Sequence, residues 1–77
     1  MIQEIPNKIC IMLVDDDPSI LQTTTVILQE EGYDVLTCSG GKQAIDKFND
    51  SVFGVILDIN MPDMSGLDVF EILKSKN

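Results

Sequence analysis

Hydrophobic positions follow two alternating patterns along the chain. Continuous apolar runs without a polar residue at every second position are typical of strands buried on both faces of a parallel sheet. Such strands are predicted at residues 9–14 and 52–57, and another short strand is predicted at 33–38. Apolar residues at helical spacing follow each strand and predict helices at residues 18–31, 42–49 and 67–74.

Capping residues set the limits of the first helix. Asp17 and Pro18 stand where an N-cap and a first helical residue are expected, and Gly32 stands where a helix stops. The side chains predicted to face the core are Ile20, Leu21, Thr24, Ile27 and Leu28 in the first helix, Ala44, Ile45 and Phe48 in the second, and Leu67, Phe70, Ile72 and Leu73 in the third.

Strands that alternate with helices predict an α/β fold with a parallel sheet and right-handed crossovers. In such sheets, ligands bind beyond the carboxyl ends of the strands. Asp15 and Asp16 directly follow the first strand, and Asp58 directly follows the third. If these two strands are neighbours, the three carboxylates meet in one small pocket.

Three carboxylates at such close range repel one another, and a divalent cation relieves the repulsion. Carboxylate and carbonyl oxygens suit Mg²⁺ or Mn²⁺, and a carboxylate at the site is also a possible nucleophile toward a phosphoryl group. Asp17 is explained as a helix cap alone. The Asn60 carbonyl is a further possible ligand, which spacing alone leaves undecided.

Composition limits the other classes of function. The 77 residues carry a net charge of −8 with no histidine, which argues against nucleic acid, anionic membranes, zinc sites and Ser–His triads. Cys10 and Cys38 are predicted to lie near opposite strand ends, too far apart for a disulfide. With no secretory signal pattern and no CxxC motif, we expect a reducing cytoplasmic location.

Two sequence blocks in register resemble the receiver domain of two-component response regulators. The blocks are Met-Leu-Val-Asp-Asp-Asp-Pro at 12–18 and Val-Ile-Leu-Asp-Ile-Asn-Met-Pro-Asp-Met-Ser-Gly at 55–66. The resemblance implies a flavodoxin-like, three-layer α/β fold. It also implies a phosphorelay role, in which a receiver accepts a phosphoryl group without being a turnover enzyme.

The same resemblance implies a role for each matched residue. Asp58 would accept the phosphoryl group of a sensor histidine kinase or phosphotransfer protein. Asp15, Asp16, Asp58 and the Asn60 backbone carbonyl would hold Mg²⁺. Pro62 and Gly66 would shape the loop after the acceptor.

The chain departs from that family in the number of its βα units. Receivers have five, and this sequence accounts for three, so residues 1–77 are expected to be the N-terminal three-fifths of a receiver, with 1–7 as a tail. In receivers, two phosphate-binding groups follow the fourth and fifth strands, and this sequence accounts for only three strands. We therefore expect phosphorylation to be impaired. We also expect the third strand to be an apolar edge that favours a homodimer or other assembly.

Two other functions are compatible with parts of the pattern. One is a protein-interaction module without phosphorylation, acting as a decoy or a dimerising fragment. The other is a phosphatase of the haloacid dehalogenase type, which also places an aspartate after a strand. Such enzymes usually carry a second aspartate two residues later, where this sequence has Asn60.

Overall fold

A computed structural model describes residues 8–76 of the chain, so the predicted tail at 1–7 lies outside the described residues. Strands and helices alternate strictly along the chain. Their order is β1 (Cys10–Val14), α1 (Pro18–Glu30), β2 (Asp34–Cys38), α2 (Gly41–Lys47), β3 (Val52–Leu57) and α3 (Gly66–Lys76). All six predicted elements are present, with bounds that differ by at most two residues at either end.

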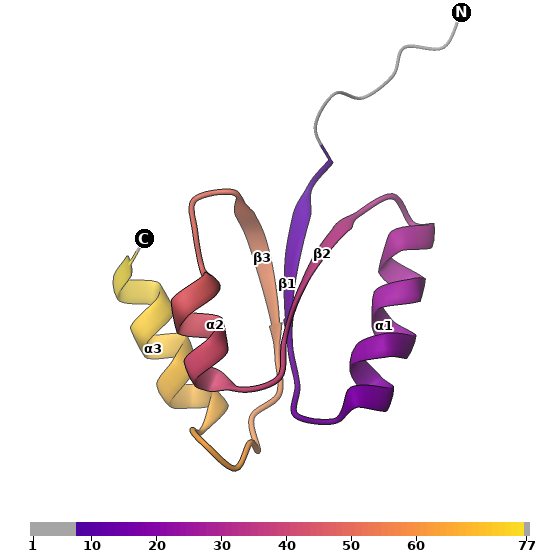
Figure 1. The fold of residues 1–77 in the computed structure, drawn as a ribbon. Coiled ribbons are helices and arrows are strands. Elements are labelled where there is room, and N and C mark those ends of the chain that lie inside the picture. The colour runs from indigo at the N-terminus through magenta and orange to yellow at the C-terminus, as the bar shows by residue number, and fades with distance from the viewer. Residues whose placement is uncertain (1–7, 77) are drawn as a thin grey trace, which may run out of the picture.

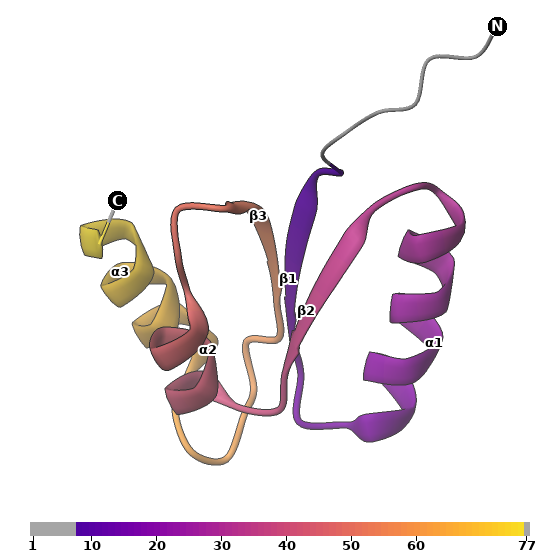
Figure 2. The same ribbon diagram turned by 45° about the horizontal axis from the view of Figure 1, so that its top comes forward.

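The three strands form one parallel sheet in the order β2-β1-β3. Helix α1 covers one face of the sheet, whereas α2 and α3 lie together on the other (Figure 1). Figure 2 shows the same three layers after rotation. The predicted α/β class is therefore confirmed, and β1 and β3 are neighbours whose carboxyl ends share one edge of the sheet.

The main hydrophobic core lies between the sheet and the pair α2–α3. Its buried members are Met12, Val14, Cys38, Ala44, Met61, Val69 and Leu73. Leu13, which alternates with Met12 and Val14 along β1, is also buried. Met61 belongs to the loop between β3 and α3, so this loop is packed into the core.

The predicted caps of α1 are confirmed. Asp17 is the N-cap, its side chain accepts a hydrogen bond from the Ser19 N–H at 2.9 Å, and Pro18 opens the helix. At the other end, Gly32 has φ +96°, a left-handed conformation that glycine adopts without strain.

The prediction that the third strand is buried on both faces is wrong. Phe53 is 77% exposed and Ile56 47% exposed. The reason is the position of β3 at the sheet edge, since among residues 8–76 only β1 pairs with it. An apolar sequence shows that a strand can be buried on both faces. Whether it is buried depends on how many strands and helices pack beside it.

The predicted inward faces of α1 and α3 need correction. Ile20 and Ile27 are exposed on α1, which leaves Leu21, Thr24 and Leu28 half-buried. On α3 the exposed side chains include Leu67, Phe70 and Ile72. The buried pair there is Val69 and Leu73, four residues apart on the stripe that faces α2 and the sheet.

Both cysteines are free thiols, as predicted. Cys10 pairs with Asp34 and Cys38 with Val14, which places the two thiols at opposite ends of the sheet. Burial raises the pKa of the Cys38 thiol, which favours its protonated form. Within residues 8–76, no helix combines the length and apolar character needed to cross a membrane.

Candidate metal centre

The carboxyl ends of β1 and β3 carry the acidic residues, and the sheet fixes their backbones. The Asp15 N–H donates to the Cys38 carbonyl on β2 at 3.0 Å, and the Asp58 N–H donates to the Val14 carbonyl on β1 at 3.0 Å. Both bonds continue the parallel ladder one residue beyond the strands. The relative positions of Asp15 and Asp58 are thus set by strand pairing.

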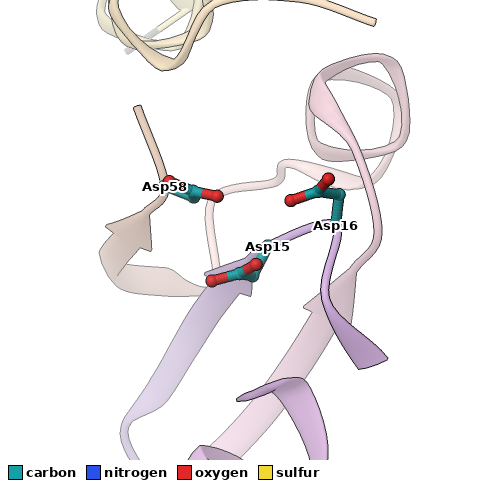
Figure 3. A group of neighbouring side chains, drawn as sticks. All are labelled: Asp15, Asp16 and Asp58. Atoms are coloured by element: carbon teal, nitrogen blue, oxygen red, sulfur yellow. The ribbon is translucent and has the colours of Figure 1, made fainter. Parts of the chain in front are cut away.

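The predicted convergence of three carboxylates is confirmed. One oxygen from each of Asp15, Asp16 and Asp58 lies within 4.8 Å of the others. Asp15 and Asp58 are half-buried, and Asp16 is exposed. In Figure 3 the carboxylates of Asp16 and Asp58 face one another across the site, with Asp15 below them at the end of β1.

Local hydrogen bonds orient two of these carboxylates. Asp15 Oδ1 accepts a bond from the Asp17 N–H at 2.9 Å, and Asp58 Oδ1 accepts one from the Asn60 N–H at 3.2 Å. Each bond uses one carboxylate oxygen, so each side chain retains acceptor capacity for another ligand.

The donor set fits a hard divalent cation. Every group in the cluster is a carboxylate, which suits Mg²⁺ or Mn²⁺ better than zinc or copper, and the negative charges within 4.8 Å favour a positive ion between them. Asp17 is engaged in capping α1 and lies outside this cluster.

Sequence comparison assigns the family. The family model of the response regulator receiver domain matches residues 11–77. This chain is a member of the response regulator receiver domain family. The receiver is 38% identical over 68 residues to the CpxR homolog of Haemophilus influenzae, a transcriptional regulatory protein, and the match covers 87% of the chain. It is 38% identical over 66 residues to the cell cycle transcriptional regulator CtrA of Caulobacter vibrioides, covering 83% of the chain.

Solved structures share the fold of the receiver. TrrA of Thermotoga maritima, solved in complex with Mg²⁺-BeF, matches 88% of this chain with a TM-score of 0.82 and 41% identity. A CheY-like receiver domain protein of Methanospirillum hungatei matches 92% with a TM-score of 0.85 and 32% identity. These neighbours support the flavodoxin-like fold implied by the sequence blocks.

The receiver spans only part of the proteins that it matches. It covers 30% of the CpxR homolog and 28% of CtrA. It covers 60% of the TrrA chain and 58% of the Methanospirillum chain.

Sequence reasoning missed one residue beside the site. Asp63, in the loop between β3 and α3, accepts hydrogen bonds through its carboxylate oxygens from the first two N–H groups of α2. A partial signal was present, because Gly40 and Gly41 at the start of α2 offer no side chain to cap that helix. Which distant residue supplies the cap is visible only in the folded chain.

Proposed function

We propose that this receiver accepts a phosphoryl group on Asp58 in a two-component phosphorelay. The observation that carries the proposal is the set of three carboxylates within 4.8 Å at the carboxyl ends of two neighbouring parallel strands, in a member of the receiver family. We expect a single accepting event on Asp58 rather than catalytic turnover of a substrate.

We assign Asp15, Asp16, Asp58 and the Asn60 carbonyl as the groups that would hold Mg²⁺. A bound Mg²⁺ neutralises charge on the transferred phosphoryl oxygens. The half-buried positions of Asp15 and Asp58 support the assignment, because a carboxylate removed from water gains more from a nearby cation than an exposed one.

The transfer step needs one nucleophile from this chain. An Asp58 carboxylate oxygen attacks the phosphorus of a phosphohistidine, and an oxygen–phosphorus bond forms as the nitrogen–phosphorus bond breaks. The bonding electron pair leaves with the imidazole nitrogen, which then binds a proton from solvent. The Asn60 N–H holds Asp58 Oδ1 and thereby orients the side chain for attack.

We propose a sensor histidine kinase or a phosphotransfer protein as the donor. TrrA, which is 42% identical to this chain over the matched region, has been solved in complex with the histidine kinase ThkA. The free thiols of Cys10 and Cys38 agree with the reducing cytoplasm in which we expect this exchange.

A direct test is phosphorylation by acetyl phosphate, followed by intact-mass and peptide analysis. We expect slow, Mg²⁺-dependent labelling of Asp58, which Asp58→Asn abolishes. Asp46→Asn removes the same charge from α2, away from the cluster, and should be labelled like the wild type. Absence of label at every Mg²⁺ concentration, or undiminished labelling of Asp58→Asn, would reject the proposal.

The second candidate is a protein-interaction module that needs no phosphorylation. It is favoured by the apolar edge of the sheet, where Phe53 is largely exposed and a groove of about 330 Å³ runs between β3 and α3. Unpaired strand edges are templates for pairing with another chain. We propose a second copy of this chain as the partner, joined through β3.

A further inference from the structure

Helix α2 begins without a cap of its own. Its N-cap residue is Gly40, which has no side chain to bind the free N–H groups of the first turn. Asp63 supplies the missing acceptors from the loop between β3 and α3. Its Oδ1 accepts from the Gly41 N–H at 3.1 Å and its Oδ2 from the Lys42 N–H at 3.2 Å.

The contact is fitted closely on both sides. A Cβ added to Gly40 would lie 2.9 Å from Asp63 Oδ2, a distance that real Cβ atoms essentially never show. Glycine at position 40 thus leaves the space in which the carboxylate sits. The two backbone hydrogen bonds lower the pKa of Asp63, which is consistent with an ionised carboxylate bound to both N–H groups.

The loop that Asp63 holds is the loop that follows the proposed phospho-acceptor. It runs from Ile59 to Ser65 and contains Asn60. The Gly66 N–H donates to the Ile59 carbonyl at 2.8 Å and closes the base of the loop. Met61 anchors one side of it in the core. Asp63 attaches the exposed part to α2, an element that contributes no residue to the carboxylate cluster.

We infer that Asp63 is a positioning residue of the metal centre. Its hydrogen bonds attach this loop to α2 and so hold Asn60 beside Asp58. The inference rests on the proposed Mg²⁺ site, because only with an ion does the position of the Asn60 carbonyl have a chemical effect. Asp63 itself is not a member of the carboxylate cluster.

A pair of variants separates two effects of Asp63: attachment of the loop to α2 and capping of α2. Asp63→Ala removes both the cap of α2 and the attachment of the loop to α2. Gly40→Ser combined with Asp63→Ala restores a local cap, since a serine at the N-cap accepts from the N–H groups of the first turn. The carboxylate that would collide with the new Cβ is absent from this double variant.

Two measurements are made on the full chain: amide hydrogen exchange without metal, and Mg²⁺ affinity by calorimetry. We expect Asp63→Ala to accelerate exchange in residues 41–45 and 59–65. It should also weaken Mg²⁺ binding by about tenfold, the lower end for groups that orient metal ligands. In the double variant, amide exchange should return to the slow wild-type rate in α2 only. Asp63→Asn should retain part of the Mg²⁺ affinity.

The inference would be overturned if the double variant regained both the wild-type exchange rate in residues 59–65 and the wild-type Mg²⁺ affinity. Asp63 would then act only as a cap of α2. If the wild type binds no Mg²⁺, the proposed function fails, and loop exchange alone decides whether Asp63 holds the loop. In that case, wild-type exchange of residues 59–65 in the double variant would also overturn the inference.

Discussion

Gly66 lies directly against the backbone of Asp58. A Cβ at position 66 would meet the Asp58 carbonyl oxygen and would lie 2.7 Å from the Ile59 Cα. Backbone atoms cannot turn aside as a flexible side chain can, so the first residue of α3 fixes the backbone that carries the proposed acceptor. The role of Gly66 in shaping this loop, which the sequence blocks implied, has this physical reason.

Gly66→Ala is therefore expected to destabilise the chain by about 1–3 kcal/mol, the range for overpacking a closely packed site. Urea unfolding measures the change. Gly54→Ala is the matched control, since its Cβ would meet only Ile11 Cδ1 at 3.5 Å, an ordinary contact. Equal effects of the two substitutions would contradict the packing explanation.

Mg²⁺ should stabilise the folded chain through the carboxylate cluster. An ion that binds only the native state contributes about 2.7 kcal/mol when its concentration is a hundred times its Kd. Asp16→Asn should remove most of this gain, while it stabilises the metal-free chain by up to about 1 kcal/mol through relief of repulsion. Thermal unfolding with and without MgCl₂ measures both changes in Asp16→Asn: the smaller stabilisation by Mg²⁺ and the higher stability without metal. CaCl₂ and NaCl serve for comparison.

Asp17 should behave differently from its neighbour Asp16. Asp17→Ala removes the acceptor for the Ser19 N–H and should cost about 1 kcal/mol of stability, whereas Asp17→Asn keeps a good cap and should cost little. Neither change should abolish the Mg²⁺ effect on unfolding. Loss of that effect in Asp17→Asn would show that the residue belongs to the metal centre.

The stability of the chain should depend on pH through Asp63. Its pKa is lower in the folded state, so its contribution is fully present above the ordinary carboxyl pKa of about 4 and is lost as the pH falls through the folded value. The stability difference between wild type and Asp63→Asn should be constant near neutral pH and shrink as the pH falls below about 4, as measured by urea unfolding.

Lys42 and Asp46 line the same hollow as Asp63 and supply the other charges there. Asp46→Asn removes a carboxylate from this hollow that is not bound to the first N–H groups of α2. It is the charge control for the pH series. A difference between wild type and Asp63→Asn that stays unchanged down to pH 2 would contradict the role of the two hydrogen bonds.

Self-association should depend on the β3 edge. Phe53→Lys places a charge on the exposed strand and should raise the dimer dissociation constant by at least about tenfold, because charges on edge strands oppose pairing. Sedimentation velocity over a micromolar concentration series measures it. Ile27→Lys, on α1, changes an exposed apolar residue elsewhere and should leave the association constant near the wild-type value. A monomeric wild type would rule the dimer out.

Local pattern and topology were enough to predict most of this structure. Strands separated by helices imply a parallel sheet, and the ends of β1 and β3 then bring Asp15, Asp16 and Asp58 together. The inward face of α3 could not be predicted in this way. Apolar residues surround most of that helix, and the tertiary packing against the sheet and against α2 at Gly41 buries Val69 while Phe70 stays exposed.

The Asp63 contact was beyond local pattern for a different reason. Residues 41 and 63 are 22 positions apart, and no periodicity or motif in either segment refers to the other. The contact exists because the sheet order brings the loop after β3 to the start of α2. A contact between a loop and the start of a distant helix depends on the whole fold, so local sequence pattern does not predict it.

The two hydrogen bonds that extend the ladder past β1 and β3 have a thermodynamic consequence. Because the N–H groups of Asp15 and Asp58 are already paired with neighbouring strands, folding alone brings these two proposed ligands together. An arriving ion then requires no rearrangement of the sheet and buries little apolar surface. Its binding enthalpy should consequently vary little with temperature, the calorimetric signature of a preformed centre.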